Sequence, residues 1–200
     1  MRQGVGMRSA WSAGLLLLGL LVAFRALGAA FTEQLPNFNP LLALFLCSIA
    51  CVRGPVAWGL PLAAWILSNP LASWLQGYAP FGEWGPVLTA LLSLAVIGAA
   101  AVLLRRRPSA PVLLGSSVLA AVLFHAVTGV AAWITYPPYA PGAEGLWQAL
   151  WSGPPGATLP SWAFLRNLAA ANLAFTALFL LARHSWLPRP AACPVVPTTR

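Results

Sequence analysis

Long apolar runs separated by very short polar segments constrain this chain more than any other feature. Of its 200 residues, 60% are hydrophobic and only 7% are charged. A soluble domain carries about a quarter charged residues, because it needs them to cover a surface that faces water. A chain with so few charges cannot cover such a surface, so we expect its solvent to be lipid.

The apolar runs have the length of membrane-spanning helices. A helix that crosses the hydrocarbon core of a bilayer needs about 20 apolar residues, with a range of roughly 17 to 25. The sequence therefore predicts an all-α, polytopic integral membrane bundle of about six transmembrane helices. The predicted spans are residues 11–30, 38–52, 55–75, 85–104, 111–136 and 161–182. Residues 1–186 would form a single transmembrane domain, and residues 187–200 a disordered cytoplasmic tail.

Two of these spans have an alternative interpretation. The second run is the shortest and could pair with the third as a re-entrant hairpin. Arg53 would then lie near the middle of the membrane, which costs about 2.5–3.5 kcal/mol on insertion scales, so six spans are preferred. The first run follows Arg2 and Arg8 as a signal peptide would. It continues to about Ala30 with Arg25 inside it and no clear cleavage site after it, which favours a retained span.

The arginines predict the orientation of the bundle. The net charge is +8, and every cation is Arg. All of them except Arg25 and Arg166 flank the spans in alternate segments: Arg2, Arg8, Arg53, Arg105, Arg106, Arg107, Arg183, Arg189 and Arg200. The acids lie in the opposite loops, at Glu33, Glu83 and Glu144. This is the positive-inside pattern. It predicts a multi-pass protein of the cell inner (plasma) membrane with both termini cytoplasmic, and it gives no reason to expect a nucleic-acid partner.

Polar residues inside the spans, together with those of the loop after the first span, are the candidate functional residues, because polar groups in spans are costly and rare without a role. In the predicted orientation nearly all of them fall in the outer half of the bundle. A substrate pocket open to the outside would be built in this way. The candidate substrate-binding residues are Arg25, Asn37, Asn39, Asn69, His125, Thr128, Trp133, Arg166, Asn167 and Asn172.

Each candidate also has a purely structural interpretation. Arg25 and Arg166 could snorkel to the outer headgroups, and His125 could be a hydrogen-bond partner in helix packing. Asn167 and Asn172 could only bridge helices. Asparagines beside prolines serve in turns and caps, and here these are Asn37, Asn39 and Asn69. The sequence leaves both interpretations open.

Catalysis is not expected. There is no Gly-x-Ser-x-Gly, His-Glu-x-x-His or phosphate-binding Gly-rich loop. With no Asp and only three acids, we expect neither an enzyme nor a proton relay, and no catalytic residue, metal or cofactor. Cys47, Cys51 and Cys193 make no disulfide framework and are too few for a metal site. If the chain moves a solute actively, a partner must supply the energy.

Several stretches carry a resemblance. They are Leu35-Pro-Asn-Phe-Asn-Pro40, Gly59-Leu-Pro-Leu-Ala-Ala-Trp-Ile-Leu-Ser68, Phe124-His-Ala-Val-Thr-Gly-Val-Ala-Ala-Trp133 and Trp162-Ala-Phe-Leu-Arg-Asn167. Together they resemble an uncharacterised family of bacterial membrane proteins over most of the chain. That family is similar in layout to the substrate-binding S components of energy-coupling factor transporters.

The resemblance implies a capture subunit that binds a small solute from outside and works with a transmembrane coupling subunit and ATPases. Two departures bear on it. The family often has Ser-Asp where this chain has Ser68-Asn69, which leaves no carboxylate there. The Ala-x-x-x-Ala docking pattern near the first span is only approximated, by Ser9 with Ala13 and by Ala10 with Gly14.

Two functions remain open at this stage. In the preferred one, the chain is an S-component-like capture subunit whose arginines favour an anionic or strongly hydrogen-bond-accepting ligand. Trp133 and the last outer loop, about residues 137–160, would form a lid, with 145–151 as a short interfacial helix. In the alternative, the chain is a non-transporting membrane scaffold or accessory subunit of a larger complex.

Overall fold

The computed structural model covers the full chain and describes residues 18–19, 21–31, 34–52, 54–75, 77, 84–106 and 108–186. The predicted tail 187–200 and the first part of the first predicted span lie outside these residues. All regular structure in the described part is helical, which confirms the predicted all-α class.

The helices follow the predicted runs closely. After the helical segment Leu21–Ala30 come α2 (Leu41–Cys51), α3 (Val56–Leu75), α4 (Trp84–Leu104), α5 (Ala110–Thr135), α6 (Gly142–Trp147), the π-helical turn η1 (Gln148–Ser152) and α7 (Ser161–Trp186). Each predicted span therefore contains a helix. The two short elements α6 and η1 occupy the long connection between α5 and α7, near the predicted interfacial helix.

Among the described residues, three helices are long and apolar enough to cross a membrane: Val87–Leu104, Ala110–Thr135 and Ser161–Ala182. Helix α2 has only 11 residues and is about 16 Å long, which is roughly half the thickness of a bilayer core. Helix α3 has 20 residues but contains Pro61 and Pro70 and is not one of the three. Helix length and composition thus establish three membrane-length helices in the described part of the chain, and the six predicted spans are not confirmed.

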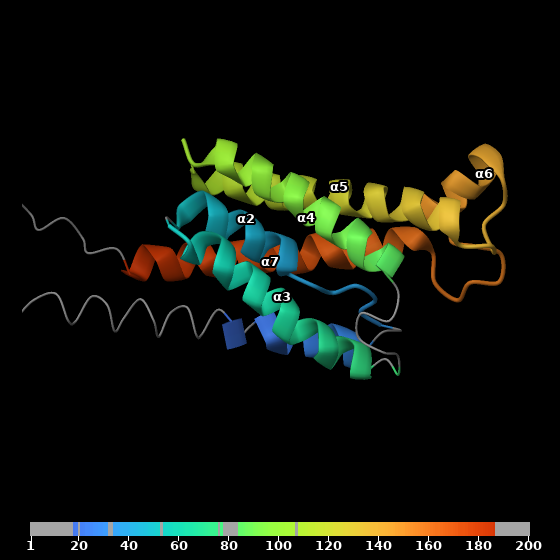
Figure 1. Ribbon diagram of the computed structural model, residues 1–200, viewed down its shortest axis with the longest axis horizontal. Helices are drawn as coiled ribbons and strands as arrows, with labels where there is room; N and C mark the ends of the chain where they lie inside the picture. Colours follow the sequence, from blue (N-terminus) through green and yellow to red (C-terminus); the bar gives the residue numbers. More distant parts are fainter. Residues whose placement is uncertain are drawn as a thin grey trace, which may run out of the picture.

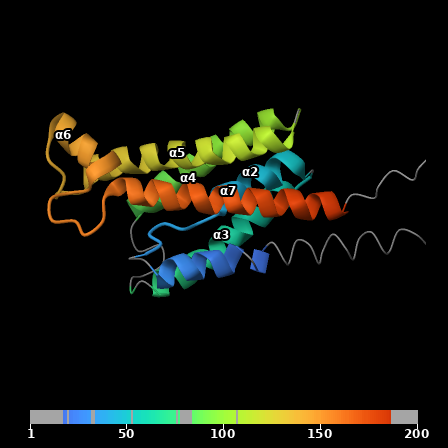
Figure 2. The ribbon, with the colours of Figure 1, turned by 180° about the vertical axis from the view of Figure 1, so that it is seen from behind.

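Helix α2 lies at the centre of the bundle, where it packs against α3, α4, α5 and α7 (Figure 1). Consecutive long helices run in alternate directions along the molecule, and α5 lies alongside α7. The view from behind shows the same arrangement, with α6 at the end of the bundle opposite to the last residues of α7 (Figure 2). The segment Leu21–Ala30 and α3 form one side of the bundle.

The sequence of α2 explains this central position. Every residue from Leu41 to Ala50 is buried. A helix that is apolar all round has no face for water and is stable only when other elements surround it. The surrounding helices contribute large apolar side chains to the core around α2. Phe175 of α7 and Phe45 of α2 are both fully buried in this core.

The last turn of α2 is joined to neighbouring segments by side-chain hydrogen bonds. Arg105, which follows α4, donates from Nε to the Ile49 carbonyl at 2.6 Å, one of the last-turn carbonyls that a helix cannot satisfy itself. Ser48 donates from Oγ to the Ala57 carbonyl of α3 at 2.9 Å. Pro61 has no N–H, so the carbonyl four residues before it has lost its helical partner. Ser48 replaces that missing donor.

This pairing gives the first prediction. Ser48→Ala leaves the Ala57 carbonyl without its donor and should lower the free energy of unfolding by about 1 kcal/mol. In a Pro61→Ala background, residue 61 regains its N–H, so the same serine substitution should cost clearly less. Thermal or denaturant unfolding of the purified protein measures all four combinations.

Ser93→Ala is the matched control, because buried Ser93 donates to the Thr89 carbonyl within its own helix. It should cost less than Ser48→Ala. An equal cost of Ser48→Ala in both backgrounds would contradict the proposed link between the serine and the proline.

Candidate functional site

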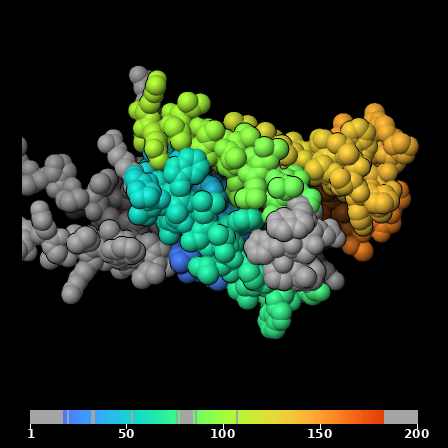
Figure 3. Space-filling view, viewed as in Figure 1, coloured from blue at the N-terminus to red at the C-terminus, as the bar shows by residue number. Residues whose placement is uncertain are grey.

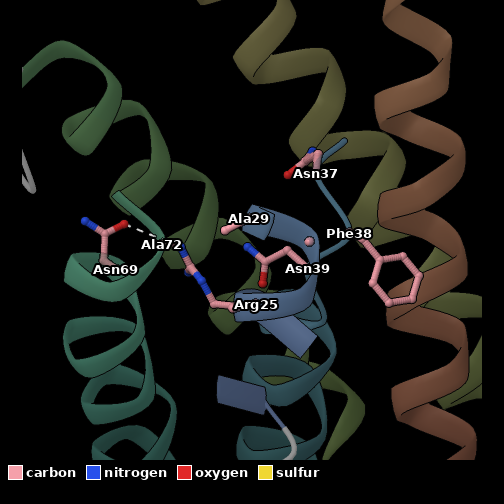
Figure 4. Close-up of a pocket in the computed structure, with 8 residues that line it drawn as sticks. Arg25, Ala29, Asn37, Phe38, Asn39, Asn69 and Ala72 are labelled. Carbon is pink, nitrogen blue, oxygen red and sulfur yellow. Dashed lines mark hydrogen bonds between the residues drawn. The ribbon is translucent and has the colours of Figure 1, made fainter. Parts of the chain in front are cut away.

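The candidate site is a cavity of about 160 Å³ between the segment Leu21–Ala30, the irregular stretch 34–40 and α3. Its lining residues are Arg25, Gly28, Ala29, Asn37, Phe38, Asn39, Asn69 and Ala72 (Figure 4). Three separate parts of the chain thus bring one guanidinium and three amide side chains to the same place. Four of the ten predicted site residues meet here, namely Arg25, Asn37, Asn39 and Asn69.

Arg25 reaches from the first helical segment toward α3. Its Nη2 donates to Oδ1 of Asn69 at 3.5 Å, longer than the usual 2.9–3.0 Å for N–H···O bonds. A guanidinium has five N–H donors in a planar fork, so Arg25 can bond to several groups at once.

The stretch 34–40 packs closely against the first helical segment. A Cβ added to Gly28 would lie 2.6 Å from the Phe38 carbonyl oxygen, so glycine permits this approach. The rings of Phe24 and Phe38 stack with centroids 5.5 Å apart. Asn37 has a φ of 57°, a left-handed conformation that asparagine tolerates better than most residues. These features turn Asn37 and Asn39 toward the cavity without a regular helix.

Asn39 and Asn172 cap the beginning of α2. Oδ1 of Asn39 accepts the N–H of Leu41 at 3.0 Å, and Oδ1 of Asn172 accepts the N–H of Ala43 at 2.6 Å. Nδ2 of Asn172 donates to the carbonyls of Asn39 at 3.1 Å and Leu168 at 2.7 Å. Asn172 is completely buried. It therefore fixes, from α7, both the first turn of α2 and a residue that lines the cavity.

Asn167 also holds the irregular stretch from α7. Its Nδ2 donates to the Pro36 carbonyl at 3.2 Å, and its Oδ1 accepts a hydrogen bond from Arg166 Nε at 3.1 Å. Arg166 is exposed and stacks over the Trp162 ring, with the guanidinium carbon 5.1 Å from the ring centroid. The structure thus places Asn167 and Asn172 behind the cavity and Arg166 outside its lining.

The remaining three predicted residues lie at the end of the bundle that carries α6. His125 Nε2 is 2.9 Å from the Leu150 carbonyl of η1, and the Trp133 indole N–H donates to the Ala140 carbonyl at 3.3 Å. Thr128 donates to the Phe124 carbonyl within its own helix at 2.8 Å. Trp133 lines a second, more open depression with Tyr136 and Tyr139, not the cavity. The His125 and Trp133 contacts join α5 to the α5–α7 connection, whereas the Thr128 bond stays within α5.

Figure 3 shows that this connection projects beyond the end of α3. In the predicted lid, Trp133 and residues 137–160 would close over the bound solute. Trp133 bonds to this connection, and no residue of 137–160 is among the described residues that line the cavity, so the lid stays a prediction.

Sequence reasoning missed four lining residues, Gly28, Ala29, Phe38 and Ala72. Three of them are small, and small residues in an apolar run carry no signal that separates a cavity wall from ordinary helix packing. Phe38 lies between two predicted asparagines, but its stacking on Phe24 depends on the tertiary fold. Within the described part of the chain, no three His, Cys, Asp or Glu residues are grouped as metal ligands.

Comparison with known proteins identifies the family of the chain. The sequence profile of a family of unknown function, DUF6580, matches residues 7–191. No curated protein and no solved structure matches the chain. The match confirms the resemblance to an uncharacterised family, and nothing in it connects that family to S components.

The second prediction concerns Asn172. Asn172→Leu keeps the approximate volume but removes an acceptor from the Ala43 N–H and two donors, leaving buried backbone groups unpaired, each worth about 1–3 kcal/mol. We expect a loss of about 2 kcal/mol or more in the free energy of unfolding, measured by thermal or denaturant unfolding. Asn172→Asp keeps an oxygen that can accept the Ala43 N–H. It replaces the NH₂ group, which donates to the Asn39 and Leu168 carbonyls, with a second carboxyl oxygen.

Thr176→Val is the matched control, because Thr176 is equally buried one turn further along α7 and its contact to Cys47 Sγ is a long 4.0 Å. It should cost less than Asn172→Leu. If the two substitutions cost the same, Asn172 does not have the special role that its hydrogen bonds indicate.

Proposed function

The chain belongs to the family of unknown function DUF6580, and we propose that it is a membrane subunit that captures a small solute from the outer face, in the manner of an energy-coupling factor S component. The observation that carries this proposal is the cavity between the first helical segment, residues 34–40 and α3. It joins Arg25 to three asparagines from two other segments. Charged and amide groups inside an apolar bundle are costly. Their convergence on one cavity supports the proposal that they bind a solute there.

The proposed membrane arrangement keeps six crossings. Three helices cross on their own, and α3 and the first helical segment would cross beside them. Helix α2 and the irregular stretch before it would together make the second crossing. Backbone without helical hydrogen bonds is tolerated at membrane depth when protein surrounds it, and here Asn39, Asn167 and Asn172 hydrogen-bond it. Broken helices of this kind form solute sites in transporters.

The orientation supports capture from outside. Arg105 and Arg106 lie at the junction of α4 and α5, at the end of the bundle where α2 also ends. The cavity adjoins the beginning of α2 and so lies toward the opposite end. Arginine-rich ends of membrane proteins face the cytoplasm. In the inner membrane the cavity would then face outward, with both termini inside.

A partner would complete the transport cycle. The sequence has no nucleotide-binding motif, so uptake against a gradient would need a transmembrane coupling subunit with ATPases. A scaffold or accessory function is the second candidate. One observation favours it: His125, Thr128, Asn167 and Asn172 all hydrogen-bond within the chain, as helix-packing residues do. Under that function the cavity would bind no solute.

The third prediction tests solute binding. Purified full-length protein is screened by thermal shift against vitamins, vitamin precursors and small organic anions. A ligand with a dissociation constant a hundredfold below its concentration should stabilise the protein by about 2.7 kcal/mol, which gives a clear rise in melting temperature. Asn69→Leu, which keeps the volume but removes the amide, should reduce that rise.

Thr135→Val serves as the control, because exposed Thr135 bonds only within α5 and lies outside the cavity. It should keep the full ligand response. If no compound stabilises the protein while a specific protein partner co-purifies with it, the scaffold function replaces solute capture.

A further inference from the structure

The open depression at the end of α5 is separate from the candidate site, and the two share no lining residue. It has a volume of about 310 Å³, and its lining includes the rings of Trp133, Tyr136 and Tyr139 together with Pro137 and Pro141. No charged or amide side chain is among the described residues that line it. The aromatic rings are therefore the main groups with which this depression can recognise a ligand.

Local contacts hold these rings in place. The Trp133 indole N–H donates to the Ala140 carbonyl at 3.3 Å, which ties the last turn of α5 to the chain that follows it. The Tyr139 N–H donates to the Tyr136 carbonyl at 3.3 Å. The two tyrosine rings meet edge to face, with centroids 5.7 Å apart and planes at 65°. Aromatic rings at different angles around one depression are the elements of an aromatic cage.

An acidic side chain lies behind the depression. The N–H of Ala140, a lining residue, donates to Oε1 of Gln148 at 3.1 Å, and Nε2 of Gln148 donates to Oε1 of Glu144 at 3.4 Å. The next residue, Gly145, lies against Trp133, because a Cβ added to it would be 2.9 Å from the indole nitrogen. The exposed carboxylate of Glu144 therefore favours a cation over an anion in this part of the molecule.

The membrane limits what this depression can select. Helix α5 is one of the membrane-length helices, so in the proposed orientation its last turn lies at the outer boundary between hydrocarbon and water. An apolar solute gains little by moving there, because lipid tails are as apolar as protein side chains. An anion would meet ring faces that carry partial negative charge. A cation is attracted by the same ring faces, and the hydrocarbon of the bilayer offers it nothing comparable.

The lining also limits the kind of cation. A primary ammonium group is strongly hydrated and has three N–H donors that need acceptors, and the lining has no carboxylate or amide side chain to replace its water. A quaternary ammonium group has no N–H and places methyl groups against the ring faces.

We propose that this depression binds a quaternary ammonium group, such as the trimethylammonium group that choline and phosphatidylcholine share. Its volume of about 310 Å³ is sufficient, since a cavity of about 150 Å³ in another protein holds benzene. The proposal goes beyond solute capture and does not depend on it, because it uses a different part of the molecule.

The experiment measures binding to the full-length protein in a maltoside detergent by saturation-transfer NMR of the ligand protons. The probes are choline, the primary amine ethanolamine and dimethylbutanol, the neutral isostere of choline in which carbon replaces the charged nitrogen. Titration gives the dissociation constant of each probe. Choline should bind at least about tenfold more tightly than either of the other two, because only choline combines a positive charge with methyl groups that contact the rings.

Variants show whether the rings are responsible. Tyr136→Leu keeps an apolar side chain but removes a ring face, and it should weaken choline binding by about fivefold. Tyr136→Phe keeps the ring and should stay within about twofold of the unaltered protein. Trp147→Leu is the matched control, because exposed Trp147 pairs with Trp151 and does not line the depression. If Tyr136→Leu does not fold, the comparison of choline with dimethylbutanol on the unaltered protein still tests the proposal.

Nanodiscs distinguish a lipid headgroup from a dissolved solute as the source of the ammonium group. Choline is titrated into discs of phosphatidylethanolamine and phosphatidylglycerol, and into discs that also contain phosphatidylcholine. If phosphatidylcholine abolishes choline binding, the lipid headgroup occupies the depression. If choline binds equally in both discs, the natural ligand is a solute.

Equal affinity for choline and dimethylbutanol overturns the proposal, and so does unchanged choline binding in folded Tyr136→Leu. The proposal also fails if choline binds neither in detergent nor in either type of disc. These outcomes leave solute capture untouched, because the Asn69→Leu variant tests that function in a separate cavity.

Discussion

The structure depends on one constraint: α2 is too short to cross a membrane, is buried from Leu41 to Ala50, and must have its end groups hydrogen-bonded by protein. The unpaired N–H and carbonyl groups at helix ends are expensive to bury. Here side chains from three other parts of the chain hydrogen-bond some of them. Asn39 and Asn172 cap the beginning of α2, and Arg105 bonds a carbonyl of its last turn.

The same constraint accounts for the position of the cavity. Because α2 begins only at Leu41, the chain before it must run through the bundle as an irregular stretch. Asn167 and Asn172 of α7 hold that stretch on one side, and Phe24 and Gly28 contact it on the other. Asn37 and Asn39 then line the space that faces Arg25 and α3. The cavity has a polar lining because an irregular stretch, rather than a helix, precedes α2. The same stretch is also bonded to α7 of the bundle.

The sequence predicts the helices well because apolar run length is a local property. All six predicted runs contain helices, and the boundaries of α3, α4 and α5 lie within a residue of prediction. Run length does not show how a helix is enclosed, so the run 38–52 could not be recognised as a half-length helix inside the bundle. The pairing of Ser48 with the carbonyl freed by Pro61 is equally invisible, since it depends on α2 and α3 lying side by side.

Because polar residues are costly in apolar runs, the sequence indicates which types of residue line the site. It does not show which of these residues lie together. Arg25, Asn37, Asn39 and Asn69 come together because three segments converge. His125 and Trp133 belong to the same predicted set, yet they bond to the α5–α7 connection. Nothing in residue type distinguishes a cavity amide from a packing residue; only tertiary contacts do.

The central claim is that the broken α2 region forms a polar cavity that opens to the outside of the cell. Its most direct test uses single cysteines in a chain whose Cys47, Cys51 and Cys193 are replaced by alanine. Asn69→Cys lies in the cavity lining, and Ser109→Cys lies exposed just before α5. A small membrane-impermeant methanethiosulfonate should modify Asn69→Cys in intact cells, and Ser109→Cys only after the membrane is opened. The reverse pattern, with Ser109→Cys modified in intact cells and Asn69→Cys protected, would contradict the account.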